Sequence, residues 1–75
     1  MMDEQLDLRG LKCPMPVLHT RKLLRRMPIG GTATVLCTDP LSAIDIPHLL
    51  RETGDELVTL ARDTDVLRFT IRRRG

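Results

Sequence analysis

One short stretch of the chain, Cys13-Pro14-Met15-Pro16, combines a nucleophilic side chain with a signal for the start of a helix. Proline is favoured at the first position of a helix, where its missing N–H has no cost. We therefore expect Cys13 at the N-cap, where the helix dipole and the neighbouring Lys12 favour a thiolate. Pro14 and Pro16 remove two nearby N–H donors, so we expect only a modest lowering of the Cys13 pKa. The alternative is a small buried apolar residue, as many free cysteines are.

The second cysteine, Cys37, closes the second predicted strand. If the first two strands are parallel, their carboxyl ends meet at one edge of the sheet, and Cys37 and Cys13 are neighbours. Cys37 is then a resolving thiol or a second sulfur site, or else a packed strand residue. The last interpretation is favoured, because free cysteine commonly serves as a small hydrophobe.

The remaining polar candidates are His19, His48, Asp39 and Asp45. The histidines and cysteines show no C-x-x-C or H-x-x-x-H spacing, so we predict no metal site and place both histidines on helix surfaces. We interpret Asp39 as a helix N-cap and Asp45 as an acid that orders a loop, rather than as an acid/base pair. No glycine-rich phosphate loop is present.

The elements that must position Cys13 follow from apolar periodicity and from proline and glycine punctuation. We expect strands near residues 4–8, 32–38, 56–61 and 66–72, and helices near residues 14–27 and 40–53. Gly54 stops the second helix, and Pro47 either kinks it or opens its regular part. The order β-α-β-α-β-β predicts an α+β fold: a two-layer sandwich whose four-stranded mixed sheet carries two helices on one face.

The first predicted helix has two unlike faces. One face is apolar and suits a core, and the other carries the cations Arg21, Lys22, Arg25 and Arg26. Met15 and Leu18 fall on the basic side, close to Cys13. This arrangement predicts either a partner-docking patch or isolated apolar surface residues.

Composition limits the functions that are possible. The chain has 75 residues, a net charge of +2 and one aromatic residue, Phe69. This length excludes a multi-domain enzyme, and we expect one domain over residues 1–75. The mild charge and the lack of aromatic platforms argue against direct nucleic-acid binding. We interpret the terminal arginines, residues 72–74, as a solvated tail. Two cysteines, with no signal peptide and no membrane-length apolar run, predict a cytoplasmic protein with reduced thiols.

The sequence also resembles a known family, the TusA/SirA-like small sulfur carrier proteins. The resemblance covers nearly the whole chain, and the matching residues are Leu6-Asp7-Leu8-Arg9-Gly10-Leu11-Lys12-Cys13-Pro14-Met15-Pro16-Val17, Thr38-Asp39-Pro40, Asp45-Ile46-Pro47, Gly54-Asp55-Glu56-Leu57 and Ile71-Arg72-Arg73. Cys37, and Asp55 within Gly54-Asp55-Glu56, depart from the family's usual pattern.

The resemblance implies the same β-α-β-α-β-β fold and a persulfide carried on Cys13, with no cofactor. It implies a cysteine desulfurase or a rhodanese-type protein as the sulfur donor, and a cysteine of another protein as the acceptor. Relatives serve 2-thiouridine synthesis in tRNA, sulfur oxidation or molybdenum cofactor assembly. Whether such a carrier counts as a sulfurtransferase enzyme stays open.

Two other functions remain as alternatives to the sulfur carrier. One is a non-catalytic interaction module that uses the basic face of the first helix to bind an acidic protein or RNA. The other is a redox or metal protein that uses Cys13 together with Cys37. Replacing Cys13 abolishes only the carrier and redox activities, and replacing Cys37 abolishes only the redox activity.

Overall fold

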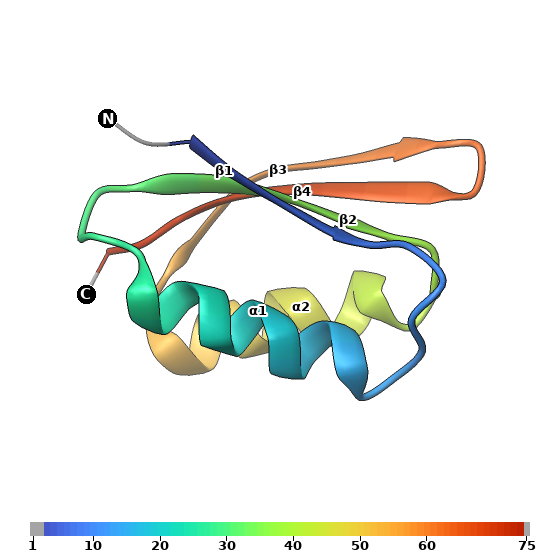
Figure 1. Cartoon of the computed structure of the whole chain (residues 1–75), viewed down its shortest axis with the longest axis horizontal. Helices are drawn as coiled ribbons and strands as arrows, with labels where there is room; N and C mark the ends of the chain where they lie inside the picture. Colours follow the sequence, from blue (N-terminus) through green and yellow to red (C-terminus); the bar gives the residue numbers. More distant parts are fainter. Residues whose placement is uncertain (1–2, 75) are drawn as a thin grey trace.

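The computed structural model describes residues 3–74, which form a sheet and two helices in the order β-α-β-α-β-β. The elements are β1 (Asp3–Leu8), α1 (Met15–Arg26), β2 (Thr32–Cys37), α2 (Ser42–Thr53), β3 (Glu56–Asp63) and β4 (Val66–Arg72). The strands lie in the order β1-β2-β4-β3, with β1 parallel to β2 and β4 antiparallel to both of its neighbours. Both helices lie on one face of the sheet (Figure 1). The predicted α+β two-layer sandwich is confirmed.

The core lies between the sheet and the helices. Alternate residues of the central strands point into it, because successive side chains of a strand face opposite sides. The buried residues of β2 and β4 are Ala33, Val35, Cys37, Leu67, Phe69 and Ile71. The predicted apolar face of α1 packs against them through Leu23 and Leu24, and α2 contributes Ile46, Leu49 and Leu50. The two helices thus have a fixed orientation over the sheet.

The two ends of α2 test the helix-start and helix-stop signals that the sequence predicts. Gly54 follows the helix with φ of 81°, a left-handed conformation that favours glycine, so the predicted stop is confirmed. Pro47 lies inside the helix, which continues through it from Ser42 to Thr53. The N-cap is Leu41, and no side chain caps this end. The prediction of Asp39 as N-cap is therefore wrong.

The prediction of a solvated arginine tail is wrong for residues 72 and 73. Arg72 ends β4 and its guanidinium lies 3.3 Å from the Glu56 carboxylate. Arg73 turns back under α1 and its guanidinium donates to the main-chain carbonyls of Leu24 and Met27, the latter at 3.0 Å. These carbonyls lie at the carboxyl end of α1, where helical N–H partners run out, although the Leu24 carbonyl also accepts from the Met27 N–H at 3.3 Å. Arg73 therefore satisfies the carboxyl end of α1.

The parallel pairing of β1 and β2 decides where the site lies. Both strands end at the same edge of the sheet, so the loops that follow Leu8 and Cys37 emerge at one end of the molecule. In Figure 1 these two loops and the β3–β4 turn lie together at the right of the view. Cys13 is in the first of these loops.

Candidate functional site

Cys13 is an exposed free cysteine in the loop between β1 and α1. The N-cap of α1 is Pro14, so Cys13 lies one residue before the predicted position. The N–H of Met15 donates to the Lys12 carbonyl at 2.8 Å, which takes up the one early donor that the prolines leave near the sulfur. The helix start thus presents Cys13 outward without bonding its thiol.

A carboxylate from the β2–α2 segment holds this loop in place. The Cys13 N–H donates to one carboxylate oxygen of Asp39 at 2.7 Å, and the Leu41 N–H donates to the other at 3.1 Å. These two bonds, with the nearby Lys12 charge, lower the Asp39 pKa. The neighbouring Thr38 hydroxyl accepts from the Gly10 N–H at 2.8 Å. Asp39 therefore orders the Cys13 loop, the kind of role that the sequence had assigned to Asp45.

The thiol of Cys13 faces a second carboxylate. Its Sγ lies 3.4 Å from Oδ2 of Asp45, in the first turn of α2, and donates a hydrogen bond to it. This bond raises the Cys13 pKa, with smaller contributions from partial removal from water and from the negative charges of Asp45 and Asp39. The predicted modest lowering is therefore wrong. Two carboxylates, which the tertiary fold brings to the loop, outweigh the dipole of a helix whose donors are absent or already bonded.

Two hollows adjoin Cys13. The larger, of about 530 Å³, extends from residues 10–13 to the segment 38–41. The smaller, of about 210 Å³, lies between the helices, with Pro14, Val17 and Leu49 as its apolar part and Asp45, His48 and Glu52 as its polar part. Both are open and shallow, which suits contact with another protein better than enclosure of a small molecule.

Exposed apolar side chains occur near the amino ends of both helices. Met15 and Leu18 on α1 are 40% and 48% exposed, so their predicted position outside the core is confirmed. Leu41 and Ile44, at the start of α2, are exposed at 52% and 67%. Sequence reasoning missed this second pair, although Ile44 lies off the buried stripe of α2 at helical spacing. Leu41 also lines the larger hollow next to Cys13, and Met15 lies two residues after it in the chain.

Cys37 does not share this exposure. Its side chain is 0% exposed, within the core on the last residue of β2, and it pairs in register with Leu8. Burial raises the pKa of its thiol. The interpretation of Cys37 as a packed strand residue is confirmed. The shared sheet edge brings the two chain segments together, but one thiol faces solvent and the other faces the core.

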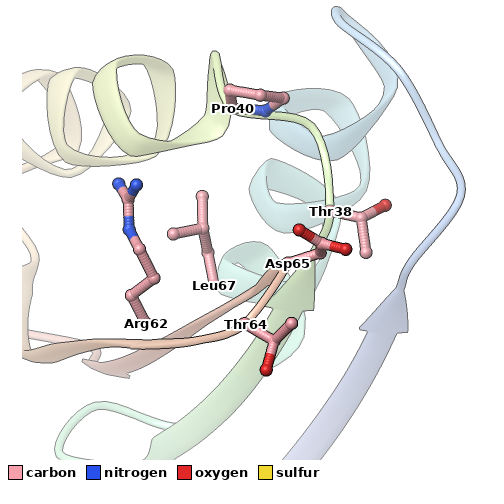
Figure 2. A pocket seen from close by; sticks show the side chains of 6 residues that line it. All are labelled: Thr38, Pro40, Arg62, Thr64, Asp65 and Leu67. Carbon is pink, nitrogen blue, oxygen red and sulfur yellow. The ribbon is translucent and has the colours of Figure 1, made fainter.

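A further hollow, of about 190 Å³, lies between the β3–β4 hairpin and the segment after β2 (Figure 2). Arg62, Thr64, Asp65 and Leu67 line it from the hairpin, and Cys13 is not among the residues that line it. In Figure 2 the Arg62 and Leu67 side chains both extend from the hairpin toward the layer that holds the helices. This hollow therefore does not adjoin the Cys13 thiol.

Other residue types add little to the site. Among residues 3–74, no group of three or more His, Cys, Asp or Glu side chains is arranged to hold a metal ion. His48 is exposed, with its Nε2 3.7 Å from a Glu52 oxygen, and His19 is half-buried on α1. Neither helix in the described part of the chain has the length and apolar character of a membrane span.

With this geometry in place, comparison with known proteins assigns the family. The model of the family described as sulfurtransferase TusA matches residues 4–73. The chain belongs to the TusA family. The sulfur carrier protein TusA of Allochromatium vinosum is 35% identical over 71 residues, which cover 95% of this chain and 93% of that protein. A relative from Archaeoglobus fulgidus is 39% identical over 70 residues, covering 92% of this chain and 91% of its own.

A solved structure supports the same assignment. The crystal structure of a SirA-like protein from Desulfitobacterium hafniense matches with a TM-score of 0.81 at 28% identity, covering 99% of this chain and all of the other. The predicted resemblance to TusA and SirA-like proteins is thus confirmed. In this TusA family member, the C-P-x-P cysteine is the exposed Cys13 and not the buried Cys37.

Proposed function

We propose that this protein is a sulfur carrier that holds sulfane sulfur as a persulfide on Cys13. The observation that carries the proposal is the exposure of this thiol on a loop fixed by Asp39, between two open hollows. Membership of the TusA family, and the name of the A. vinosum relative, support the same role. We take residues 1–75 as one carrier domain, and we expect it in the cytoplasm, where thiols stay reduced.

The proposed transfer has two displacement steps. The Cys13 thiolate attacks the outer sulfur of a donor persulfide, the S–S bond of the donor breaks, and the donor cysteine leaves as a thiolate. Cys13 is then a persulfide. The thiolate of an acceptor protein attacks the outer sulfur of that persulfide, and Cys13 leaves as a thiolate. Each step forms one bond to sulfur and breaks another, so no oxidant, metal or organic cofactor is needed.

The partners follow from this chemistry. The donor is a protein that forms a cysteine persulfide, of the cysteine desulfurase or rhodanese type, and the acceptor is a protein thiol. Both must reach Cys13 in turn across the exposed apolar residues Met15, Leu18, Leu41 and Ile44. Small contact areas suit partners that exchange. We propose no direct contact with nucleic acid, so any route to a thiolated tRNA or to sulfur oxidation runs through the acceptor.

Intact mass spectrometry tests the proposal. Wild type, Cys13→Ser and Cys37→Ala are incubated with a cysteine desulfurase and cysteine. We expect wild type and Cys37→Ala to gain one sulfur atom, reversed by a reductant, and Cys13→Ser to gain none. Loss of the gain in both variants would indicate a two-thiol relay. No gain in wild type, with this donor or with a rhodanese, would contradict the carrier function and favour the interaction module on the basic face of α1.

A further inference from the structure

The carboxylate of Asp45 has a relation to the Cys13 thiol that no other acidic side chain of the described residues shares. It lies on α2, while the thiol belongs to the loop before α1, and Oδ2 accepts the sulfur's hydrogen bond at 3.4 Å. Both residues line the hollow of about 210 Å³ between the helices, next to Val17 and Leu49. The contact therefore joins the two chain segments that form the site, the β1–α1 loop and α2.

We propose that Asp45 is a positioning residue, which keeps the resting Cys13 thiol protonated and directs its sulfur toward the hollow between α1 and α2. The proposal rests on the proposed carrier function and adds a control on it. A thiol that donates to a carboxylate must give up that bond when it ionises. Its thiolate then stands beside a negative charge, which is the less stable arrangement. The resting carrier is thus a weak nucleophile toward reagents that do not engage the site.

The other charged groups around the thiol do not replace Asp45. Asp39, on the segment before α2, accepts from the N–H groups of Cys13 and Leu41 with its two oxygens. Glu52 lines the same hollow from α2, but its carboxylate lies 3.7 Å from Nε2 of His48. Among the described residues that line the two hollows next to Cys13, Lys12 is the only lysine or arginine, and His48 lines the smaller hollow. The Lys12 charge lowers the Asp39 pKa, whereas the charges of Asp45 and Asp39 raise the Cys13 pKa.

The hydrogen bond that Asp45 accepts has a larger effect on the Cys13 pKa than the negative charge of Asp45 has. The hydrogen bond that the Cys13 thiol donates to Asp45 is the largest cause of the raised Cys13 pKa, ahead of the loss of water around the sulfur. A carboxylate elsewhere in the hollow supplies charge but not this bond. Glu52→Gln removes one negative charge from the same hollow, and Asp45→Asn removes the charge of the acceptor itself, while an amide oxygen remains that can accept a hydrogen bond. The two variants therefore separate the carboxylate that the thiol contacts from negative charge elsewhere in the hollow.

The test is the pH profile of alkylation by iodoacetamide, followed by intact mass, on the Cys37→Ala background so that one thiol reacts. At neutral pH we expect Asp45→Asn to react about threefold faster or more, because the thiolate fraction below the pKa changes tenfold for each pKa unit. Its profile shifts to lower pH. Glu52→Gln is expected to stay close to the parent. An unchanged Asp45→Asn profile, or an equal shift in Glu52→Gln, would overturn the role of Asp45.

A second measurement needs no variant at Asp45. The same profile is recorded for the Cys37→Ala chain folded and in urea. We expect the folded midpoint at the higher pH, and a folded midpoint at or below the unfolded one would contradict the proposal. Failure here is distinct from failure of the carrier function. If the chain accepts sulfur but its profile is not shifted, the carrier function stands and the role of Asp45 is contradicted. If the profile is shifted but the chain accepts no sulfur, the role of Asp45 stands and the carrier function is contradicted.

Discussion

Cys37 is expected to resist alkylation in the folded protein far more strongly than Cys13. Its side chain is 0% exposed and belongs to the core cluster that contains Phe69 and Ile46. A reagent reaches it only when the domain opens, whereas Cys13 is exposed and needs no opening. The ratio of the two rates therefore reports whether a second thiol is available to the carrier chemistry.

The size of this protection follows from the stability of a small domain. A chain of 75 residues has a free energy of unfolding of about 4 to 11 kcal/mol, at about 0.05 to 0.15 kcal/mol per residue. A factor of ten in an equilibrium constant corresponds to about 1.4 kcal/mol. If Cys37 reacts through global unfolding, its rate falls about 10³-fold to 10⁸-fold below that of an unfolded cysteine.

The assay is alkylation by iodoacetamide at about pH 8.5, where free thiols are substantially ionised, followed by intact mass over time. Cys13→Ser reports the rate of Cys37, and Cys37→Ala reports the rate of Cys13. Both variants are measured again in urea, where the two rates should converge. If folded Cys13→Ser is alkylated within about tenfold of its rate in urea, the expected protection is absent. The core position of Cys37 would then be wrong and a two-thiol relay would be open again.

Three further predictions concern the frame that holds the site, and circular dichroism measures each because the chain has no Trp or Tyr. Arg73→Met removes charged donors from two helix-end carbonyls and should destabilise the fold by about 1 to 3 kcal/mol in urea titration, with no change at all counting against that contact. Gly54→Ala should lower the free energy of unfolding by about 1 kcal/mol, because a φ of 81° disfavours any residue with a side chain. A Cβ at this position would meet no atom within 4 Å, so a much larger loss of stability would contradict the structure here. Asp7, bound to Arg9, has its pKa lowered from 3.8 to about 2, so its contribution is present above pH 3.8 and is lost as the pH falls toward 2. The melting temperatures of wild type and Asp7→Asn should converge across that window, and a constant difference would contradict the pairing.

Most of the fold could be predicted from local sequence signals. These signals depend only on residues within one short segment. They are the alternation of apolar residues in 32–38 and 66–72, the apolar face of α1 and the helix stop at Gly54. Element ends were less predictable, because they depend on contacts outside the segment. β3 runs two residues beyond the expected end, to Asp63, and the Arg73 guanidinium donates to main-chain carbonyls at the carboxyl end of α1.

The site divides in the same way. The sequence alone identified Cys13 as the candidate nucleophile, since a cysteine before Pro14 at a helix start is a local pattern. Its electrostatics were predicted with the wrong sign. The carboxylates that decide them, Asp39 and Asp45, lie 26 and 32 residues along the chain and reach the thiol only through the parallel pairing of β1 and β2.

The sequence by itself thus indicated the elements, their order and the candidate nucleophile, because helix and strand preferences and proline geometry act over a few neighbouring residues. Only the tertiary structure decided which cysteine faces solvent, what Asp39 holds, and that the Cys13 thiol donates to Asp45. The burial of a group and the effect of nearby charges depend on distances in space. β-strand pairing brings together residues that are far apart in the sequence, so the sequence separation of two residues does not give their distance.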